Sequence, residues 1–349
     1  MSSPFSFTLP PELSAKEPPE RRGIARDKVR LMVIDRASGR VEHTRFDHLG
    51  EYLRAGDLLV FNTSRTLPAS LFGCGARGGP CMEVRLAEHL PDDTWLALLL
   101  CQQGDPFGCG LRSGIEIHFG EGLTGRVTEQ DSNIPRLWKI RFSKTGAALV
   151  DLIYRLGRPI RYEYVSAPWD LDYYQTVYAR EPGSAEMPSA GRAFTWRLLL
   201  DLKRLGIETA YITLHTGLSS YMDDELDALH PASEEEYFIS DAATAKINSA
   251  RQNGNRVIAV GTTVVRALES VGDEDGQVNA GHGYTRLHVT AHHKLKIVDG
   301  LLTGLHEPEA SHLDLLTALL PAEQIKEAYE EAVSLRYLWH EFGDLNLIV

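Results

Sequence analysis

The chain has 349 residues, 43% of them hydrophobic, which is enough for two domains or for one large domain with an insertion. Its formal net charge is −12, from 48 acidic and 36 basic residues, so its overall field repels a polyanion unless basic residues gather in one place. It has no run of about 18 apolar residues and no basic-then-apolar pattern at its start, which argues against a membrane span or a signal peptide. We therefore expect a cytoplasmic protein that does not contact a membrane.

The first part of the chain predicts strands and little helix. A polar segment follows a short extended arm, and a buried-strand pattern then ends at a turn before an alternating partner strand. The predicted elements are an arm over 5–10, strands over 29–35 and 41–46, a short helix over 49–53 and a strand over 58–62. The densest basic stretch, 21–45, falls in this part; it is either a solvated face or an edge that contacts phosphate.

The sequence from 73 to about 142 is rich in glycine and alternates over short runs, without a convincing helix. This pattern is typical of a small barrel or sandwich. The predicted strands are 82–88, 95–101, 115–119, 123–128 and 138–142. Cys74, Cys81, Cys101 and Cys109 also lie here; their spacings match no zinc ribbon, and a cytoplasmic location favours free thiols.

From 147 onward, helices alternate with strands, which predicts an α/β domain with a largely parallel sheet. The fold class is thus α/β, with two domains: an α/β domain over 1–72 and 145–349, and an inserted small antiparallel β-barrel over 73–144. The predicted helices are 147–156, 194–205, 242–253, 264–271, 313–320 and 322–335, and the predicted strands are 209–215 and 257–261.

The stretch 256–269 holds the most informative polar pattern. An apolar strand leads into Gly261, Thr262 and Thr263, with Arg266 one helical turn later. Backbone N–H groups and hydroxyls at a helix start form a site for a carboxylate or phosphate, to which Arg266 can add a bidentate contact. The alternative is that Thr262 is a helix N-cap and Arg266 a surface residue.

Three other stretches place polar or small residues at the ends of predicted elements. His215 ends a predicted strand, where ligands bind in open α/β sheets, although a lone histidine is often structural. Ser189 and Gly191 precede a helix and allow close backbone approach, or Ser189 is a plain cap. Asn62 and Arg65 follow a strand in a polar loop and can position a substrate.

Together, these stretches resemble in the same order the motifs of S-adenosylmethionine:tRNA ribosyltransferase-isomerases, a family of queuosine biosynthesis. The similarity covers nearly the whole chain. The matching residues are Asn62, Arg65, Pro68 and 71–73; 174–179; 188–191, Phe194 and Thr195; 213–215 and Gly217; 259–266 in full; and 298–303 with His306.

The resemblance implies a transferase that uses S-adenosylmethionine as co-substrate and needs no metal. In the implied reaction, the ribosyl moiety is transferred to 7-aminomethyl-7-deazaguanine in tRNA and isomerised to give epoxyqueuosine, and adenine and methionine are released. A proton leaves the carbon beside the sulfonium, so the protein must supply a base, charge stabilisation and positioning.

On this resemblance, His215, Glu236 and His306 are the expected catalytic residues. The residues expected to bind S-adenosylmethionine are Gly261, Thr262, Thr263, Arg266, Asn62, Arg65, Ser189 and Gly191.

The chain departs from the family pattern at several motifs. Arg192 and Ala193 stand where the family has leucine and histidine, and acidic residues, Asp223, Glu307 and Glu309, stand in segments where the family carries basic or neutral ones. These changes count against tRNA because they remove charges that release counterions on binding. Two alternatives therefore stay open: a paralogue that uses S-adenosylmethionine on a small-molecule substrate, and a non-catalytic ligand-binding homologue. Either a monomer or a homodimer is compatible with the sequence.

A histidine-rich tract over 282–312 adds one further hypothesis. A metal site formed by His292, His293 and His306 is the alternative to a hydrogen-bonding or base role for one of these histidines.

Overall fold

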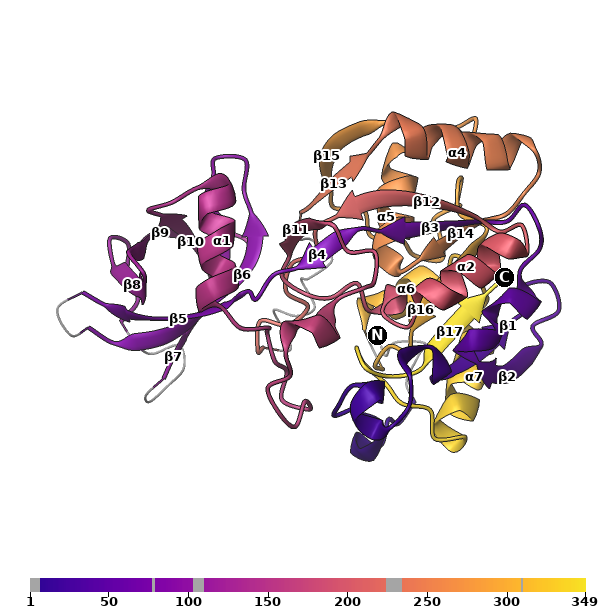
Figure 1. Cartoon of the computed structure of the whole chain (residues 1–349), viewed down its shortest axis with the longest axis horizontal. Helices are drawn as coiled ribbons and strands as arrows, with labels where there is room; N and C mark the ends of the chain where they lie inside the picture. The colour runs from indigo at the N-terminus through magenta and orange to yellow at the C-terminus, as the bar shows by residue number, and fades with distance from the viewer. Residues whose placement is uncertain (1–6, 77–78, 103–109, 224–233, 309) are drawn as a thin grey trace.

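The computed structural model describes residues 7–76, 79–102, 110–223, 234–308 and 310–349. Figure 1 shows two lobes side by side, a small β-barrel with one helix and a larger lobe built on a mixed sheet. No helix in these residues is both long and apolar enough to cross a membrane.

The larger lobe contains a nine-stranded sheet within the described residues. Neighbouring strands β12, β3, β14 and β16 run parallel, as do β17 and β1, whereas the other neighbouring pairs are antiparallel. The prediction of a largely parallel sheet therefore holds for four of the eight neighbouring pairs, because β2, β13, β15 and β17 each run antiparallel to a neighbour. In order across the sheet the strands are β15 (Gly281–Thr285), β13 (Glu235–Ile239), β12 (Glu208–Leu214), β3 (Leu58–Asn62), β14 (Val257–Val260), β16 (Gly300–Gly304), β17 (Leu345–Ile348), β1 (Arg30–Ile34) and β2 (Val41–Arg45).

Both faces of this sheet are covered because its central strands are apolar on both sides. In β3, Leu58 and Val60 pack on one face while Leu59 and Phe61 pack on the other, as the two-residue period of a strand requires. The first face carries α4 (Asp241–Gln252), α5 (Thr262–Val271), α6 (Ser311–Leu316) and α7 (Ala322–Ser334); the second carries α2 (Trp196–Arg204). The short helix expected over 49–53 is part of a 3-10 helix. The 3-10 helices are η1 (Pro11–Leu13), η2 (Pro19–Arg22), η3 (Arg26–Lys28), η4 (Phe46–Tyr52), η5 (Leu171–Tyr174) and η6 (Ser189–Gly191).

The smaller lobe is a closed antiparallel barrel, which confirms the predicted fold of this segment. Helix α1 (Gly146–Leu156) packs against the barrel through Leu149, Leu152 and Ile153. Because the first barrel strand begins at Ser70, the barrel starts slightly before the predicted boundary at 73; the exact division into domains stays a prediction. In order around the barrel the strands are β10 (Leu137–Phe142), β7 (Trp95–Cys101), β6 (Cys81–His89), β5 (Ser70–Gly75), β8 (Glu116–Gly120) and β9 (Leu123–Gln130).

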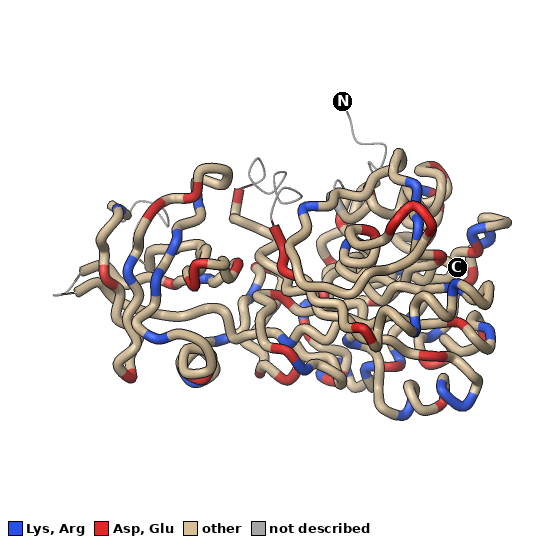
Figure 2. The backbone as a smooth tube through the Cα atoms, turned by 90° about the horizontal axis from the view of Figure 1, so that it is seen from above, with Lys and Arg blue, Asp and Glu red and all other residues tan. Residues whose placement is uncertain are grey.

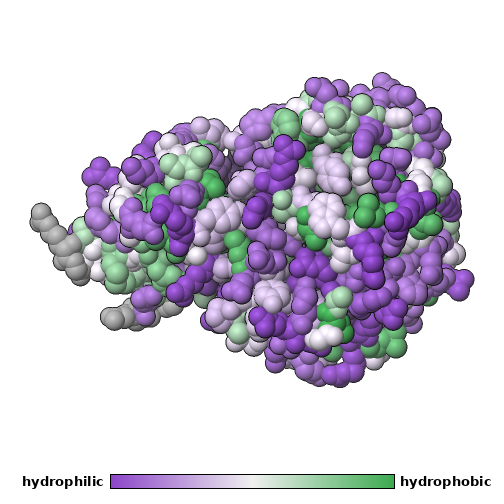
Figure 3. All heavy atoms as spheres, viewed as in Figure 1, coloured by the Kyte–Doolittle hydropathy of each residue, from purple (hydrophilic) through white to green (hydrophobic). Residues whose placement is uncertain are grey.

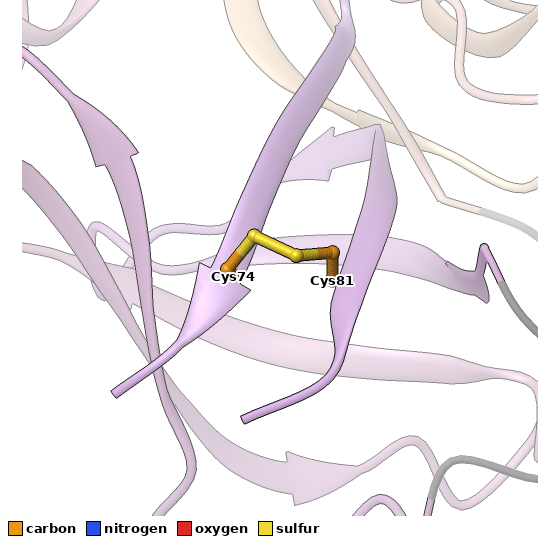
Figure 4. The surroundings of a disulfide bond; sticks show 2 residues. All are labelled: Cys74 and Cys81. Carbon is orange, nitrogen blue, oxygen red and sulfur yellow. A yellow bond between two sulfur atoms is a disulfide. The ribbon is translucent and has the colours of Figure 1, made fainter. Parts of the chain in front are cut away.

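The cysteines of the barrel correct one expectation. Cys74 and Cys81 form a disulfide (Figure 4), and Cys101 is also disulfide-bonded, so the prediction of free thiols is wrong for these three. The strand register is the physical reason, since it places Cys74 of β5 directly opposite Cys81 of β6. Cys109 lies outside the described residues.

A narrow ribbon connects the two lobes. Strand β4 (Ser64–Thr66) pairs in parallel with β11 (Glu181–Ser184), and the chain then enters the barrel. After α1 the chain returns alongside this ribbon, where Arg158 and Ser70 exchange two backbone hydrogen bonds of 2.9 Å. Gly157 ends α1 at a very close approach, because a Cβ atom there would lie 2.0 Å from the carbonyl oxygen of Pro68.

We predict that Gly157→Ala destabilises the protein by roughly 2 kcal/mol or more, since the added methyl group overlaps rigid backbone. Gly281→Ala is the matched control, because a Cβ atom at Gly281 meets nothing within 4 Å. Denaturant unfolding followed by circular dichroism measures both. Equal stability of the two variants would show that the backbone around Pro68 shifts at little cost and would contradict the prediction.

Candidate functional site

The predicted site residues lie at one edge of the large sheet. Asn62, His215, Gly261 and His306 stand at or just after the carboxyl ends of the parallel strands β3, β12, β14 and β16. The carboxyl ends of parallel strands meet at the same edge, which is where open α/β sheets bind ligands. The structure therefore places these four predicted residues at the same edge of the sheet.

Asn62 is buried at the centre of this edge. Its Oδ1 accepts hydrogen bonds from the backbone N–H groups of Ser64 and Leu214, at 3.0 Å each, and its Nδ2 donates to the Leu214 carbonyl at 2.8 Å. Nδ2 also lies 3.4 Å from Thr263 Oγ1. Asn62 thus joins the ends of β3 and β12 to the first turn of α5.

His215 is held by a short chain of hydroxyl groups. Its Nδ1 lies 2.7 Å from Ser64 Oγ, which lies 2.5 Å from Ser184 Oγ. Gly183 leaves room for the ring, since a Cβ atom there would lie 2.4 Å from Nδ1. Burial lowers the pKa of His215, which the charge of Glu236 partly opposes, so the imidazole is neutral at pH 7 and can accept a proton.

Glu236 lies beside His215 on the neighbouring antiparallel strand. The backbone N–H of His215 donates to the Glu236 carbonyl at 2.9 Å, which makes the two residues cross-strand neighbours. Glu236 Oε1 lies 2.6 Å from His282 Nε2 of β15. The structure therefore brings together two of the three residues expected to act in catalysis.

Both side chains line a cavity of about 140 Å³ between the two lobes. Its charged lining residues are all acidic, and the lining contains no lysine or arginine. Leu149 and Val150 of α1 supply part of its apolar wall. The complete lining is Leu67, Ala87, Glu88, His89, Asp93, Trp95, Gly146, Leu149, Val150, Pro182, Gly183, His215, Thr216 and Glu236.

The barrel supplies one wall of this cavity, which the sequence did not predict. Glu88 and His89 lie at the end of β6, and Trp95 begins β7 with its ring centroid 4.9 Å from that of His89. Trp95 is buried, yet its Nε1–H has no hydrogen-bond acceptor in the described part of the chain. The hairpin register, which pairs His89 with Trp95, could have indicated that these two residues lie together. No sequence motif in this segment pointed to a binding role for them.

Glu88 has the most perturbed carboxyl group in the cavity. Burial, together with the charges of Glu234 and Glu235, raises its pKa to about 8, so Glu88 is protonated at pH 7 in this structure. A cation placed in the cavity would favour the ionised form.

We predict that wild-type protein loses stability relative to Glu88→Gln as the pH rises from 5 to 8.5. The folded pKa lies above the ordinary value of 4.5, so the stabilising contribution of protonated Glu88 is complete below that value and is lost as the pH passes through about 8. Denaturant unfolding at several pH values measures the difference, with Glu12→Gln as an exposed control. A difference that is constant with pH would contradict the burial of this carboxyl group.

The Gly261 stretch forms a helix start, as predicted, but with a different cap. Gly261 is the N-cap of α5, and Thr262 is its first residue, so Thr262 does not cap this helix. Arg266 forms an ion pair with buried Glu235 and donates from Nε to the Leu287 carbonyl at 2.9 Å, while its Nη2 has no partner among the described residues. An anion-binding role for this stretch stays a prediction, with Nη2 as the available donor.

The remaining predicted residues do not line the cavity. His306 is half-buried, bonds Thr303 Oγ1 through Nε2 at 2.8 Å and stacks on His312. Ser189 borders a separate small hollow, and Gly191 packs against the Tyr178 hydroxyl. Arg65 is exposed on the ribbon, with its guanidinium over the ring of Tyr154.

The structure also addresses the basic stretch and the histidine-rich tract. Most of the cations over 21–45 already have acidic partners: Arg26 with Glu20, Lys28 and Arg45 with Asp47, Arg30 with Asp344, and Arg40 with Glu42.

In the histidine-rich tract, His293 lies 3.5 Å from Glu269 and His306 bonds Thr303. The described residues contain no group of three or more metal-ligating side chains.

Comparison with known proteins gives a consistent result. The family model described as "Queuosine biosynthesis protein" matches residues 2–348. Among the relatives, S-adenosylmethionine:tRNA ribosyltransferase-isomerases of Symbiobacterium thermophilum and Carboxydothermus hydrogenoformans are 42% and 40% identical to the chain, with coverage of 99% of this chain in both cases and of 99% and 98% of the relatives. The crystal structure of S-adenosylmethionine tRNA ribosyltransferase from Thermotoga maritima is 30% identical, covers 99% of this chain and 100% of its own, and has a TM-score of 0.56.

The fold and the site thus define a mixed α/β enzyme whose inserted antiparallel barrel closes one side of a strand-end cavity. The chain belongs to the queuosine biosynthesis protein family, and it is an enzyme of the ribosyltransferase-isomerase class.

Proposed function

We propose that this enzyme transfers the ribosyl moiety of S-adenosylmethionine to 7-aminomethyl-7-deazaguanine in tRNA and isomerises it to give epoxyqueuosine, with release of adenine and methionine. The observation that carries the proposal is the cavity where His215 and Glu236 meet, because its charged lining is entirely acidic. Both reacting groups, a sulfonium and an aminomethyl group, are cations. Complementary charge favours their binding.

His215 and Glu236 are suited to proton transfer at this position. A proton must leave the carbon beside the sulfonium, and another must leave the attacking amine. His215 is neutral, its Nδ1 lies within hydrogen-bond distance of Ser64, and no described group occupies its Nε2, so Nε2 can accept a proton. Glu236 is oriented by His282 and supplies a second acceptor.

Other groups around the cavity hold and shield the substrates. The face in Figure 3 is largely hydrophilic, with hydrophobic residues in separate patches, which fits a polar substrate. Trp95 offers an N–H donor and a flat apolar ring, which suit a heterocyclic base. The first turn of α5 and Arg266 Nη2 suit the carboxylate of the methionine portion.

We predict that the purified protein releases adenine and methionine from S-adenosylmethionine only when tRNA bearing the aminomethyl base is present. Glu236→Gln and His215→Asn lower kcat by roughly 10²-fold or more, the usual contribution of a general base. His118→Asn, an exposed barrel variant, keeps wild-type activity. Release without tRNA would instead indicate a small-molecule acceptor, and binding without release a non-catalytic homologue.

We also predict that S-adenosylmethionine binding releases a proton near pH 7. The sulfonium lowers the pKa of Glu88 from about 8, so Glu88 ionises as the cation enters. Calorimetry in buffers of different ionisation enthalpy measures the number of protons released. Glu88→Gln reduces that number, and equal release by the two proteins would remove Glu88 from the binding site.

A further inference from the structure

The ribbon between the lobes carries three exposed arginines, Arg65, Arg158 and Arg161, which we name the arginine strip. Arg65 lies over the ring of Tyr154, at 5.6 Å from guanidinium carbon to ring centroid, and Arg158 lies over Phe72 at 5.7 Å. The charge of Arg161 acts on Tyr174, whose carbonyl accepts a hydrogen bond from Thr66 next to Arg65. The three arginines therefore lie around the short segment that begins at Arg65 and Thr66 and enters the barrel.

The positive charges of the strip are not neutralised by ion pairs within the described residues. Most arginines on the larger lobe and on the barrel are in ion pairs, for example Arg197 with Asp27 and Arg85 with Glu83. In the described part of the chain, no carboxylate pairs with any of the three arginines of the strip. Glu83, which bonds Ser70 beside Arg158, is already held by Arg85 at 2.8 Å. One exposed carboxylate, Glu163, follows Arg161 and leaves a local excess of positive charge.

The strip also lies beside residues that line the acidic cavity. Arg65 pairs in register with Pro182, a cavity-lining residue, and Leu67, another lining residue, follows Arg65 by two positions. Gly157, next to Arg158, contacts Pro68. A cation-binding cavity therefore opens directly beside a surface that attracts anions.

We infer that the arginine strip binds the phosphate backbone of an RNA strand whose modified base enters the cavity. This inference rests on the proposed function and locates its macromolecular substrate. A nucleotide with a cationic base and anionic flanking phosphates matches the negative charge of the cavity and the positive charge of the arginine strip. Surfaces that bind single-stranded nucleic acid combine arginine side chains, which contact phosphate, with aromatic side chains, which stack on bases.

Figure 2 shows why net charge alone did not reveal this surface. Acidic and basic segments are interspersed over both lobes, so the formal charge of −12 describes no single face. Asp223, which replaces a neutral or basic residue of the family pattern, pairs with Arg136 at 2.6 Å and so adds little repulsion.

The test compares tRNA binding by wild type and by Arg158→Ala/Arg161→Ala. We expect the double variant to bind tRNA roughly tenfold more weakly at low salt, and the slope of log K against log salt to fall in magnitude by about 1.4, or about 0.7 for each lost contact with single-stranded phosphate. The KM for tRNA rises, whereas kcat at saturating tRNA and the affinity for S-adenosylmethionine stay unchanged.

Two controls separate a direct contact from general effects. Arg204→Ala removes one positive charge, half the change of the double variant, from an arginine that is paired with Asp201 on α2, and it should bind tRNA as wild type does. Arg158→Lys/Arg161→Lys restores the charge and most of the affinity.

Wild-type affinity and salt slope in the alanine double variant would overturn the inference, and so would an equal loss in Arg204→Ala. Failure of the proposed function is distinguishable, because it appears as wild-type protein that binds tRNA without releasing adenine.

Discussion

The site depends on the hydrogen bonds of one buried amide, that of Asn62. Only 1% of its surface is exposed, and both its oxygen and its nitrogen are bonded to backbone at the ends of β3 and β12. These bonds fix Ser64 next to β12, which in turn places Ser64 Oγ at 2.7 Å from His215. A buried amide that lost its partners would cost about 1–3 kcal/mol, so the strand ends and the histidine are held as one unit.

The acidic side chains of the cavity lower the stability of the fold, and the proposed chemistry explains why they are present. Burial of Glu88, with the charges of Glu234 and Glu235 nearby, raises the free energy of its ionised state, and Glu88 responds by retaining its proton. A cavity selected for stability alone would be lined by apolar side chains, or its carboxylates would be paired with cations. Under the proposed function, a cationic substrate relieves the same repulsion, so the unfavourable field of the cavity contributes to the binding of that substrate.

Sequence patterns predicted the elements well where periodicity was strong. The apolar runs in 95–101 and 58–62 match β7 and β3 in full, because a strand that is buried on both faces is apolar along its length. Contacts between distant segments left no such trace. The disulfide of Cys74 and Cys81 depends on the register of β5 and β6, and the cavity wall formed by Glu88 and Trp95 depends on how the barrel meets the sheet. Arg266 was predicted from its motif, but its partner Glu235 comes from a separate strand.

The structure shows that charged residues which depart from the family pattern have partners within the protein. Arg192, which stands where the family has leucine, is 3% exposed and bonds Glu20 at 2.7 Å, while Arg26 holds the other carboxylate oxygen of Glu20 at 2.9 Å. A buried guanidinium is tolerable only with such partners, so the substitution belongs to a local network that borders the small hollow by Ser189. Glu307 likewise lies 3.3 Å from His340, and Asp223 has Arg136. Arg192 and Asp223 are therefore paired within the protein, whereas the exposed arginines beside the cavity have no carboxylate partner among the described residues and are available to an external anion.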